Sequence, residues 1–300
     1  MISIFAPDGI GEIGPGTDLS ATIVTAVAAD AAGPLRTGDI VVVTSKIISK
    51  AEGRTMLAAQ RENAIDAESL GTVARRGPTR IVRTRHGLTL AGAGVDNSNV
   101  ASDSILLLPL DPDASAARLR SELEETTGAR LGVVVSDTAG RAWRIGQTDQ
   151  AIGASGVQVI ERYEGQQDAY GNELQVTAVA IADELAAAAD LAKAKLAGRP
   201  VAVVRGLERF VCSDTASPGG RQPETHAALL VRDVASDMFR YGSREAVVAA
   251  VLQATGQGDQ YEAVLDHPST ESMVAAVLAG SGRTGGEAEL LRRILLAAVG

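Results

Sequence analysis

The sequence predicts a mixed α/β or α+β fold rather than a helical bundle or a β-sandwich. Over most of the chain, segments with helical spacing of apolar residues alternate with short continuous apolar runs, a pattern typical of helices packed on a sheet. From residue 243 onward the sequence contains short helical patterns separated by glycine and no strand pattern. We therefore expect a core over 1–243 and a helical appendage over 244–300.

Each expected element follows from a local pattern. A helix is expected over 18–32, where Asp18 or Ser20 can cap the first turn. The continuous apolar runs at 39–44 and 131–135 predict buried strands. The remaining expected elements are helices over 61–76, 113–127 and 179–196, strands over 80–83, 104–108, 156–163 and 200–205, and a Ser-, Gly- and Pro-rich mobile loop over 213–225.

Composition limits the possible functions. Of the 300 residues, 45% are hydrophobic and 22% are charged, which is enough apolar material for an ordinary core. The net charge of −9 argues against nucleic acid as a partner. Cys212 is the only cysteine, which excludes an intrachain disulfide and a cysteine-rich zinc site. No apolar run is long enough to span a membrane and the N-terminus has no basic signal region, so we expect a cytoplasmic protein without a membrane partner.

The segment 134–149 carries the strongest indication of a functional site, because an apolar run ends there in a loop rich in polar side chains. Asp137 and Thr138 offer oxygens suited to a magnesium-type ion. Arg141 and Arg144 offer forked donors for phosphate or carboxylate. Since loops at the carboxyl ends of sheet strands commonly hold ligands, we expect a nucleotide–metal site here. A polar turn held by its own hydrogen bonds is the alternative interpretation.

A second segment places phosphate-binding groups after a strand. Ser45, Lys46 and Lys50 follow directly on the expected strand at 39–44. Their ammonium and hydroxyl groups can cradle phosphate oxygens. A solvated helix start with scattered lysines explains the segment equally well.

A third segment, 91–99, combines glycines with a carboxylate and an amide. Asp96 and Asn99 lie three residues apart, although an isolated string of this kind is most often a turn. Asp96 becomes significant if the chain folds it beside Asp137, because two separate carboxylates suit a nucleotide-bound metal pair.

Two nucleotide-binding fingerprints are disfavoured. The string at 9–14 matches GxGxxG, but the following Pro15-Gly16 prevents a helix from starting within the glycines, so a glycine-rich loop of another kind is favoured. The string GxxxxGK[ST] is absent from the sequence, which excludes a P-loop enzyme.

Taken in order, the polar segments resemble the γ-glutamyl ligases that extend the deazaflavin coenzyme F420. The matching runs are GDIVVVTSKIISKAEGR (38–54), AGVDNSN (93–99), SDTAGRAWRIGQTDQAIGASG (136–156), YGNEL (170–174), IADELAAAADL (181–191) and PVAVVRG (200–206). The likeness covers about residues 1–242, and the string beginning at Ser136 is long and distinctive. The resemblance implies an α+β, mixed-sheet F420 γ-glutamyl ligase-like fold that forms a homodimer.

The resemblance also implies the reaction and its site. Family members use GTP with magnesium or manganese, two ions in all, and a monovalent cation such as K⁺ is a further expectation. They join L-glutamate to the terminal carboxylate of coenzyme F420-0 and then add another through a γ-linkage. By matching position, Asp96 and Asp137 correspond to ligands of the first metal and Thr138 to a ligand of the second. Nucleotide contacts are implied for Ser45, Lys46, Lys50 and Asn99.

The expected mechanism activates a carboxylate, because an amine does not displace carboxylate oxygen unaided. Phosphoryl transfer from GTP to the acceptor provides an acyl phosphate, which glutamate's amine then attacks. We expect Lys46 and Lys50 to hold phosphate oxygens. Arg141 or Arg144 is expected to orient the acceptor carboxylate.

The chain departs from its archaeal relatives at two places. They end the long helix with a Gly-Gln pair whose glutamine serves the second metal, whereas this chain has Ala194-Lys195, and a protonated lysine cannot ligate a metal. If Lys195 has replaced that ligand, Lys195→Gln should keep or raise metal affinity in calorimetry. The N-terminal nucleotide loop also differs, since the proline is shifted to Pro7. Actinobacterial relatives often continue into a nitroreductase-like domain, for which the residues beyond 242 are too few.

Two other functions stay open from the sequence. An amide ligase of the same fold acting on another carboxylate is one, because no motif recognises the deazaflavin ring directly. A nucleotide-binding regulatory protein without turnover is the other. GDP release that depends on both acceptor and glutamate distinguishes the three.

Overall fold

The structure, a computed structural model, describes residues 1–98, 103–212, 224–267 and 269–299. Its internal contacts divide the chain into two compact units. Unit 1 contains Met1–Ala64 and Gly94–Val231, and unit 2 contains Ile65–Ala93 and Arg232–Gly300. The expected division after residue 243 differs from this one, because 65–93 pack with the C-terminal part of the chain.

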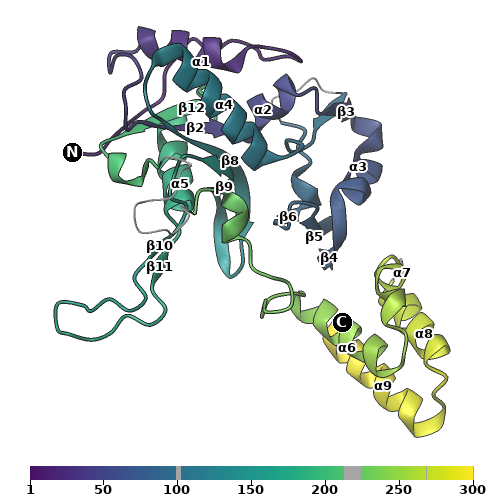
Figure 1. The fold of residues 1–300 in the computed structure, drawn as a ribbon. Helices are drawn as coiled ribbons and strands as arrows, with labels where there is room; N and C mark the ends of the chain where they lie inside the picture. The colour runs from purple at the N-terminus through teal and green to yellow at the C-terminus, as the bar shows by residue number, and fades with distance from the viewer. Residues whose placement is uncertain (99–102, 213–223, 268, 300) are drawn as a thin grey trace. The chain divides into compact units, whose positions relative to one another are not determined.

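Unit 1 is built on a five-stranded mixed sheet with the strand order β1-β12-β2-β8-β9 (Figure 1). β2 and β8 run parallel, and the other neighbouring strands run antiparallel. The mixed helix–sheet class predicted from the sequence is therefore confirmed. The strands are β1 (Ser3–Phe5), β2 (Ile40–Thr44), β8 (Gly132–Arg141), β9 (Arg144–Ser155) and β12 (Val201–Arg205).

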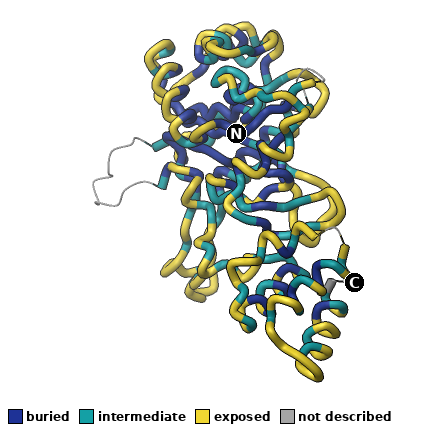
Figure 2. Tube along the Cα trace, turned by 90° about the vertical axis from the view of Figure 1, so that its right-hand side faces the viewer, coloured by how far each residue is buried: buried dark blue, intermediate teal, exposed yellow. Residues whose placement is uncertain are grey.

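The central strands of this sheet are buried on both faces. Residues 40–43 of β2 and 133–135 of β8 are fully buried, and Figure 2 shows buried residues concentrated along these strands. Ile40, Val42 and Val134 share an apolar cluster with α5 (Ile181–Lys193). Because side chains alternate along a strand, the intervening residues point to the other face.

The remaining elements of unit 1 are helices and short strands. The helices are α1 (Leu19–Ala29), capped by Asp18, α2 (Ser45–Ala51) and α4 (Pro112–Thr127), capped by Asp111. β3 (Thr55–Leu57) pairs with β7 (Ser104–Leu106), and β10 (Glu161–Arg162) pairs with β11 (Ala178–Val179). α3 (Arg61–Glu68) begins in unit 1 and ends in unit 2.

Unit 2 combines a small antiparallel sheet with the C-terminal helices. Its strands, in the order β4-β5-β6, are β4 (Ser69–Arg76), β5 (Thr79–Thr84) and β6 (Thr89–Ala91). Its helices after residue 242 are α6 (Ser243–Ala254), α7 (Tyr261–Leu265), α8 (Thr270–Ser281) and α9 (Gly285–Val299), which share an apolar core. The Glu262 and Glu245 carboxylates accept hydrogen bonds from the backbone N–H groups of Thr72 and Arg75, at 2.8 and 2.9 Å. These contacts tie the helices to the edge strand β4.

Three expected elements differ in the structure. The helix expected over 61–76 is wrong in its second half, because the chain turns at Glu68 into β4, which pairs with β5. The polar loop expected after residue 135 is wrong, because β8 continues to Arg141 and pairs with β9. The strand expected over 156–163 is reduced to β10. Most of the loop expected over 213–225 lies outside the described residues.

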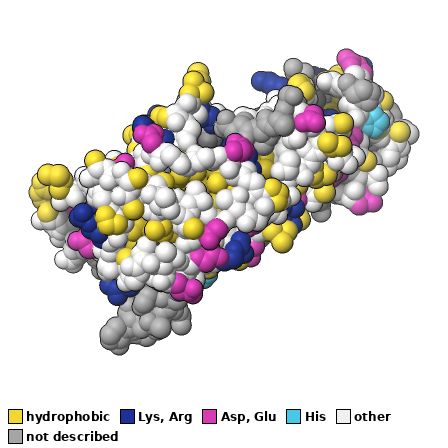
Figure 3. All heavy atoms as spheres, turned by 90° about the horizontal axis from the view of Figure 1, so that it is seen from above, with side chains coloured by type: hydrophobic (Ala, Val, Ile, Leu, Met, Phe, Trp, Pro, Cys, Tyr) yellow, Lys and Arg dark blue, Asp and Glu magenta, His cyan; other side chains and the backbone are white. Residues whose placement is uncertain are grey.

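The charged side chains do not gather into one basic region on the face drawn in Figure 3. Lysine and arginine side chains lie scattered there and are interleaved with aspartate and glutamate. None of the helices in the described parts of the chain is long and apolar enough to cross a membrane.

Candidate functional site

The parallel pairing of β2 and β8 brings two polar segments together. Thr44 lies opposite Ser136 in the register, so the residues that follow them emerge at the same edge. Ser45, the first residue of α2, donates a hydrogen bond from Oγ to Asp137 Oδ1 at 2.8 Å. The structure therefore joins two predicted site residues that are 92 positions apart in the chain.

Asp96 reaches the same place from a third segment. The Asp96 Oδ2 atom lies 2.5 Å from Lys46 Nζ, and Lys46 also hydrogen-bonds to Ser98. Asp96 further accepts hydrogen bonds from the Ser98 backbone N–H at 2.7 Å and from its hydroxyl at 2.9 Å. The turn that leads into Asp96 contains Ala93 and Gly94 at φ values of 57° and 72°. Asn99, a predicted nucleotide contact, lies outside the described residues.

The two carboxylates of this group differ in their electrostatics. Burial, helped by the charges of Asp149 and Asp96, raises the pKa of Asp137 to about 6, against the lowering effects of the Ser45 hydrogen bond and the Lys46 charge. Burial also acts to raise the pKa of Asp96, but hydrogen bonds from Lys46 and Ser98 and the Lys46 charge hold it below its ordinary value. A nearby cation would therefore stabilise the charged form of Asp137, which burial disfavours.

A second polar group, which we call the Asp149 group, lies on the other face of β8. It consists of Ser136, Thr138, Asp149 and Lys193. The hydroxyls of Thr138 and Ser136 donate to Asp149 Oδ1 and Oδ2, each at 2.8 Å. Lys193 Nζ lies 2.7 Å from Asp149 Oδ2 and donates to Ser136 Oγ at 2.8 Å. Burial acts to raise the pKa of Asp149, but the Lys193 charge and the hydrogen bonds lower it.

Sequence reasoning missed two members of this group. Asp149 lies directly opposite Thr138 in the β8–β9 pairing, so their side chains share one face. If the sequence had been interpreted as a hairpin over 134–155, this pairing of Thr138 with Asp149 would have been predicted. The loop expected from the sequence does not predict it. Lys193 lies in the last turn of α5, where the helix dipole by itself favours a cation. Its burial, at 5% exposure, shows that the ammonium instead serves an ion pair inside the protein.

Both groups line one cavity of about 700 Å³ in unit 1. Lys46, Asp137, Thr138, Asp149 and Lys193 contribute to its wall. Lys50 also lines it, and its Nζ lies 2.5 Å from Glu12 Oε1 in the glycine-rich segment at 9–14. The predicted lysines, one predicted metal carboxylate and the glycine-rich loop thus surround one space. Lys195 lines the same cavity as an exposed residue.

The donor set at Asp137 fits a hard divalent cation. Among the described residues, no three His, Cys, Asp or Glu side chains come together as a metal cluster. The available ligands are therefore the paired carboxylates of Asp96 and Asp137 with neighbouring hydroxyls, and such oxygen atoms suit Mg²⁺ or Mn²⁺. A nucleotide's phosphate oxygens complete such sites in many enzymes.

Arg141 and Arg144 lie away from this cavity. They pair with each other at the tip of the β8–β9 hairpin, are exposed, and do not line the cavity. The distance along the strand from Asp137 to Arg141 is about 13 Å at 3.3 Å per residue. Trp143 and Ile145 at the same tip are 81% and 103% exposed.

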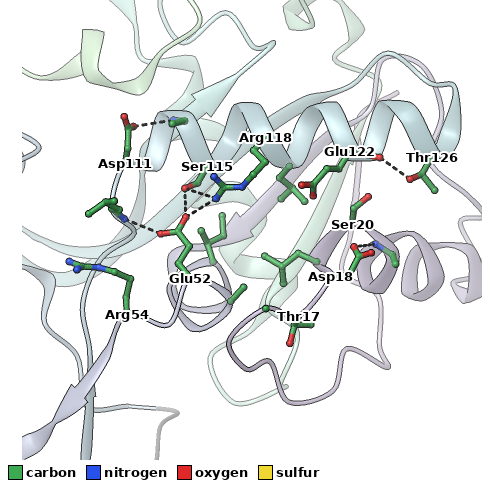
Figure 4. Close-up of a pocket in the computed structure, with 18 of the residues that line it drawn as sticks. Thr17, Asp18, Ser20, Glu52, Arg54, Asp111, Ser115, Arg118, Glu122 and Thr126 are labelled. Atoms are coloured by element: carbon green, nitrogen blue, oxygen red, sulfur yellow. Dashed lines mark hydrogen bonds and ion pairs between the residues drawn. The ribbon is translucent and has the colours of Figure 1, made fainter.

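A larger cavity of about 950 Å³ lies between the start of α1, the end of α2 and α4 (Figure 4). Its most connected charged group, Glu52, accepts hydrogen bonds from Ser115, Arg118 and the Leu110 backbone N–H. Glu52 therefore ties α2 to α4. None of the predicted site residues in the described parts of the chain lines this cavity.

Comparison with known proteins identifies the family of this chain. Residues 9–206 match the family described as F420-0:Gamma-glutamyl ligase. The chain is similar to the coenzyme F420:L-glutamate ligase of Methanothermobacter thermautotrophicus, with 34% identity over 80% of this chain and 99% of the relative. It is also similar to the enzyme of that name from Archaeoglobus fulgidus, with 38% identity over 69% and 88%, and from Methanosarcina mazei, with 36% identity over 63% and 82%. The chain therefore belongs to the F420-0:gamma-glutamyl ligase family and is a ligase of that kind.

Proposed function

We propose that the protein joins L-glutamate to coenzyme F420-0 in a reaction driven by GTP, with GDP and phosphate released. The observation that carries this proposal is that Asp137 and Lys46 line one cavity and that Asp96 is ion-paired to Lys46 there, in a chain that belongs to this family. A carboxylate pair beside an ammonium group suits a nucleotide phosphate held together with a divalent cation.

The proposed reaction has two steps. In the first, an oxygen of the acceptor carboxylate attacks the γ-phosphorus of GTP, the bond to the β-phosphate oxygen breaks, and GDP leaves. In the second, the glutamate amine attacks the carbonyl carbon of the acyl phosphate, phosphate leaves with the carbon–oxygen bond electrons, and the amine loses a proton. Repetition with the newly added glutamate gives a γ-linkage.

The chain's own residues orient and neutralise the reacting groups. Lys46 and Lys50 face the cavity and would hold phosphate oxygens, and Ser45 fixes the position of the Asp137 carboxylate. Asp96 and Asp137 would hold Mg²⁺ or Mn²⁺, which supplies charge for stabilising the transferred phosphoryl group. A monovalent cation such as K⁺ and the nucleotide contact at Asn99 remain part of this proposal.

The chain is further proposed to act as a homodimer. Trp143 and Ile145 project from the β8–β9 hairpin tip, and exposed apolar side chains grouped in this way commonly mark an interaction surface. Arg141 is about 13 Å along β8 from Asp137 of its own chain, and Arg144 lies opposite Arg141 in the hairpin. We therefore propose that they orient the acceptor carboxylate in the cavity of the partner.

The test is a product analysis with the deazaflavin acceptor, GTP and glutamate. Mass spectrometry should find the acceptor enlarged by one or more glutamates, and GDP release should require both acceptor and glutamate. GDP release with a different carboxylate but not with F420-0 would identify another substrate. Nucleotide binding without any release would indicate a protein without turnover.

A further inference from the structure

Lys193 places an ammonium group in the wall of the cavity. Its side chain is 6% exposed, and its ammonium contacts Asp149 at 2.7 Å and Ser136 at 2.8 Å. Lysine is almost never fully buried unless it is paired, so this position is built around the ion pair. Asp149 is equally enclosed, with 4% of its side chain exposed.

The contacts of Asp149 leave little capacity for a metal ion. One oxygen accepts from Thr138, and the other accepts from both Ser136 and Lys193. A divalent ion on this carboxylate would lie beside a buried ammonium or displace that ammonium from Asp149. Either arrangement leaves a buried charge poorly compensated, which is costly. The ion pair of Asp96 with Lys46 differs, because 38% of the Asp96 side chain is exposed.

Asp137 and the Asp149 group line the same cavity but make their hydrogen bonds with different elements. Asp137 contacts Ser45 of α2, whereas its neighbours Ser136 and Thr138 contact Asp149 and, through Ser136, Lys193 of α5. This is the alternation expected along β8. One ion bound at Asp137 therefore does not need the oxygens of the Asp149 group.

The charge of the cavity wall also favours few metal ions. Among the described residues that line it, five side chains are cationic and four carry carboxylates. A wall of this kind already supplies positive charge for an anionic ligand such as a triphosphate.

We propose that Lys193 supplies, as a fixed ammonium, the positive charge on the α5 side of the cavity, so that the protein binds one divalent cation, at Asp96 and Asp137, instead of two. The inference deepens the proposed function and rests on it, since the ion is the one that accompanies the nucleotide. Lys193 acts through Asp149 and Thr138 and is a positioning residue.

The test counts metal ions bound to the full chain. Mn²⁺ is titrated into protein mixed with an equimolar non-hydrolysable GTP analogue, and bound Mn²⁺ per chain is measured from the loss of the free-ion signal in electron paramagnetic resonance. The expected result for the wild-type chain is one tightly bound ion. Lys193→Met frees the oxygens of Asp149 and Thr138, so a second tightly bound ion is expected. Lys195→Met removes the same charge from an exposed position of the same cavity and should leave the count at one.

The outcomes separate this inference from the proposed function. Two tight ions in the wild-type chain, or one in a folded Lys193→Met variant, would overturn the role of Lys193 alone. No bound ion in the wild type would overturn it together with the proposed metal site. If Lys193→Met does not fold, the wild-type count still decides, and Lys193→Gln offers a neutral side chain that keeps hydrogen-bond donors. Glutamate-dependent GDP release from the same wild-type sample tests the ligase activity separately.

Discussion

Among single residues, Asp137 has the greatest influence on the proposed chemistry, because it is the cavity carboxylate with the most strongly raised pKa. Asp137→Ala should abolish ligation, with glutamate transfer reduced by two orders of magnitude or more, since the proposed cation loses a carboxylate ligand. The protein should stay folded, because the substitution removes the hydrogen bond from Ser45 and leaves the pairing of β2 with β8 in place. Product formation and circular dichroism measure the two effects. Asp233→Ala, which removes an exposed carboxylate in unit 2, serves as the control. Full glutamate transfer by the Asp137 variant would remove this residue from the mechanism.

The raised pKa of Asp137 also makes stability depend on pH. The folded chain holds this proton up to a pKa of about 6, whereas the unfolded chain releases it near pH 4. The contribution of Asp137 to stability is therefore fully present below pH 4 and is lost as the pH rises through about 6. In buffers with a chelator, the melting temperature of the wild type minus that of Asp137→Asn should fall between pH 4 and 6. A difference that is constant with pH would contradict the raised pKa.

At the scale of elements, the end of α5 contains backbone strain. Ala194 follows the helix with φ 51° and ψ 130°, a conformation that glycine adopts far more readily than alanine. Ala194→Gly should raise the free energy of unfolding by about 1 kcal/mol, because relief of strain exceeds the entropy cost of glycine. Urea denaturation measures the change. Ala192→Gly, inside the helix, should instead lower stability by about 1 kcal/mol. A loss of stability in both variants would show that Ala194 is not strained.

The edge strand β4 depends on carboxylates from the C-terminal helices. Glu245 of α6 is 5% exposed and accepts the Arg75 backbone N–H. Glu245→Ala leaves that donor without its acceptor and should cost about 1–3 kcal/mol. Faster hydrogen exchange at the β4 amides, with lower stability in urea, is the expected measurement. Glu289→Ala, at an exposed position of α9, should change stability by less than about 0.5 kcal/mol. Equal effects of the two substitutions would exclude a special role for Glu245.

Some of the helices and strands could be predicted from the sequence, and others could not. The apolar runs at β2 and β8 and the capped helix α4 are predictable, because burial and capping are local signals. The extension of β8 to Arg141 is not, because the polar residues 136–141 gain strand structure only by pairing with β9. The second half of the helix expected over 61–76 failed for the same reason, since pairing with β5 decides its conformation.

At the scale of the whole molecule, association is the central prediction. Trp143 and Ile145 at the hairpin tip should lie in the dimer interface. The double substitution Trp143→Ser and Ile145→Ser should therefore convert dimer to monomer in light scattering coupled to gel filtration. Ligation should fall with it if Arg141 and Arg144 act across the interface. As a control, Val176→Ser changes an apolar residue that is 92% exposed elsewhere in unit 1. A variant that remains dimeric would place the interface elsewhere.

The candidate site was partly predictable at this scale. Ser45, Lys46, Asp96 and Asp137 were chosen from separate strings, and the structure brings them together. Lys193 and Asp149 were missed, because an ion pair 44 positions apart leaves no local pattern. Arg141 and Arg144 were also predicted, but they lie outside the cavity of their own chain, and the role proposed for them needs a partner chain.

Unit 2 is assembled from two stretches of chain, and this affects the order in which it can form during synthesis. Residues 65–93 leave the ribosome about 140 residues before the segment that begins at Arg232. At 5–20 residues per second, the nascent hairpin waits roughly 7–30 s for the helices that supply Glu245 and Glu262. Throughout that interval the backbone N–H groups at the outer edge of β4 have to be hydrogen-bonded by water or covered by a chaperone. Slow translation or early termination should therefore expose this protein to aggregation more than its final stability suggests.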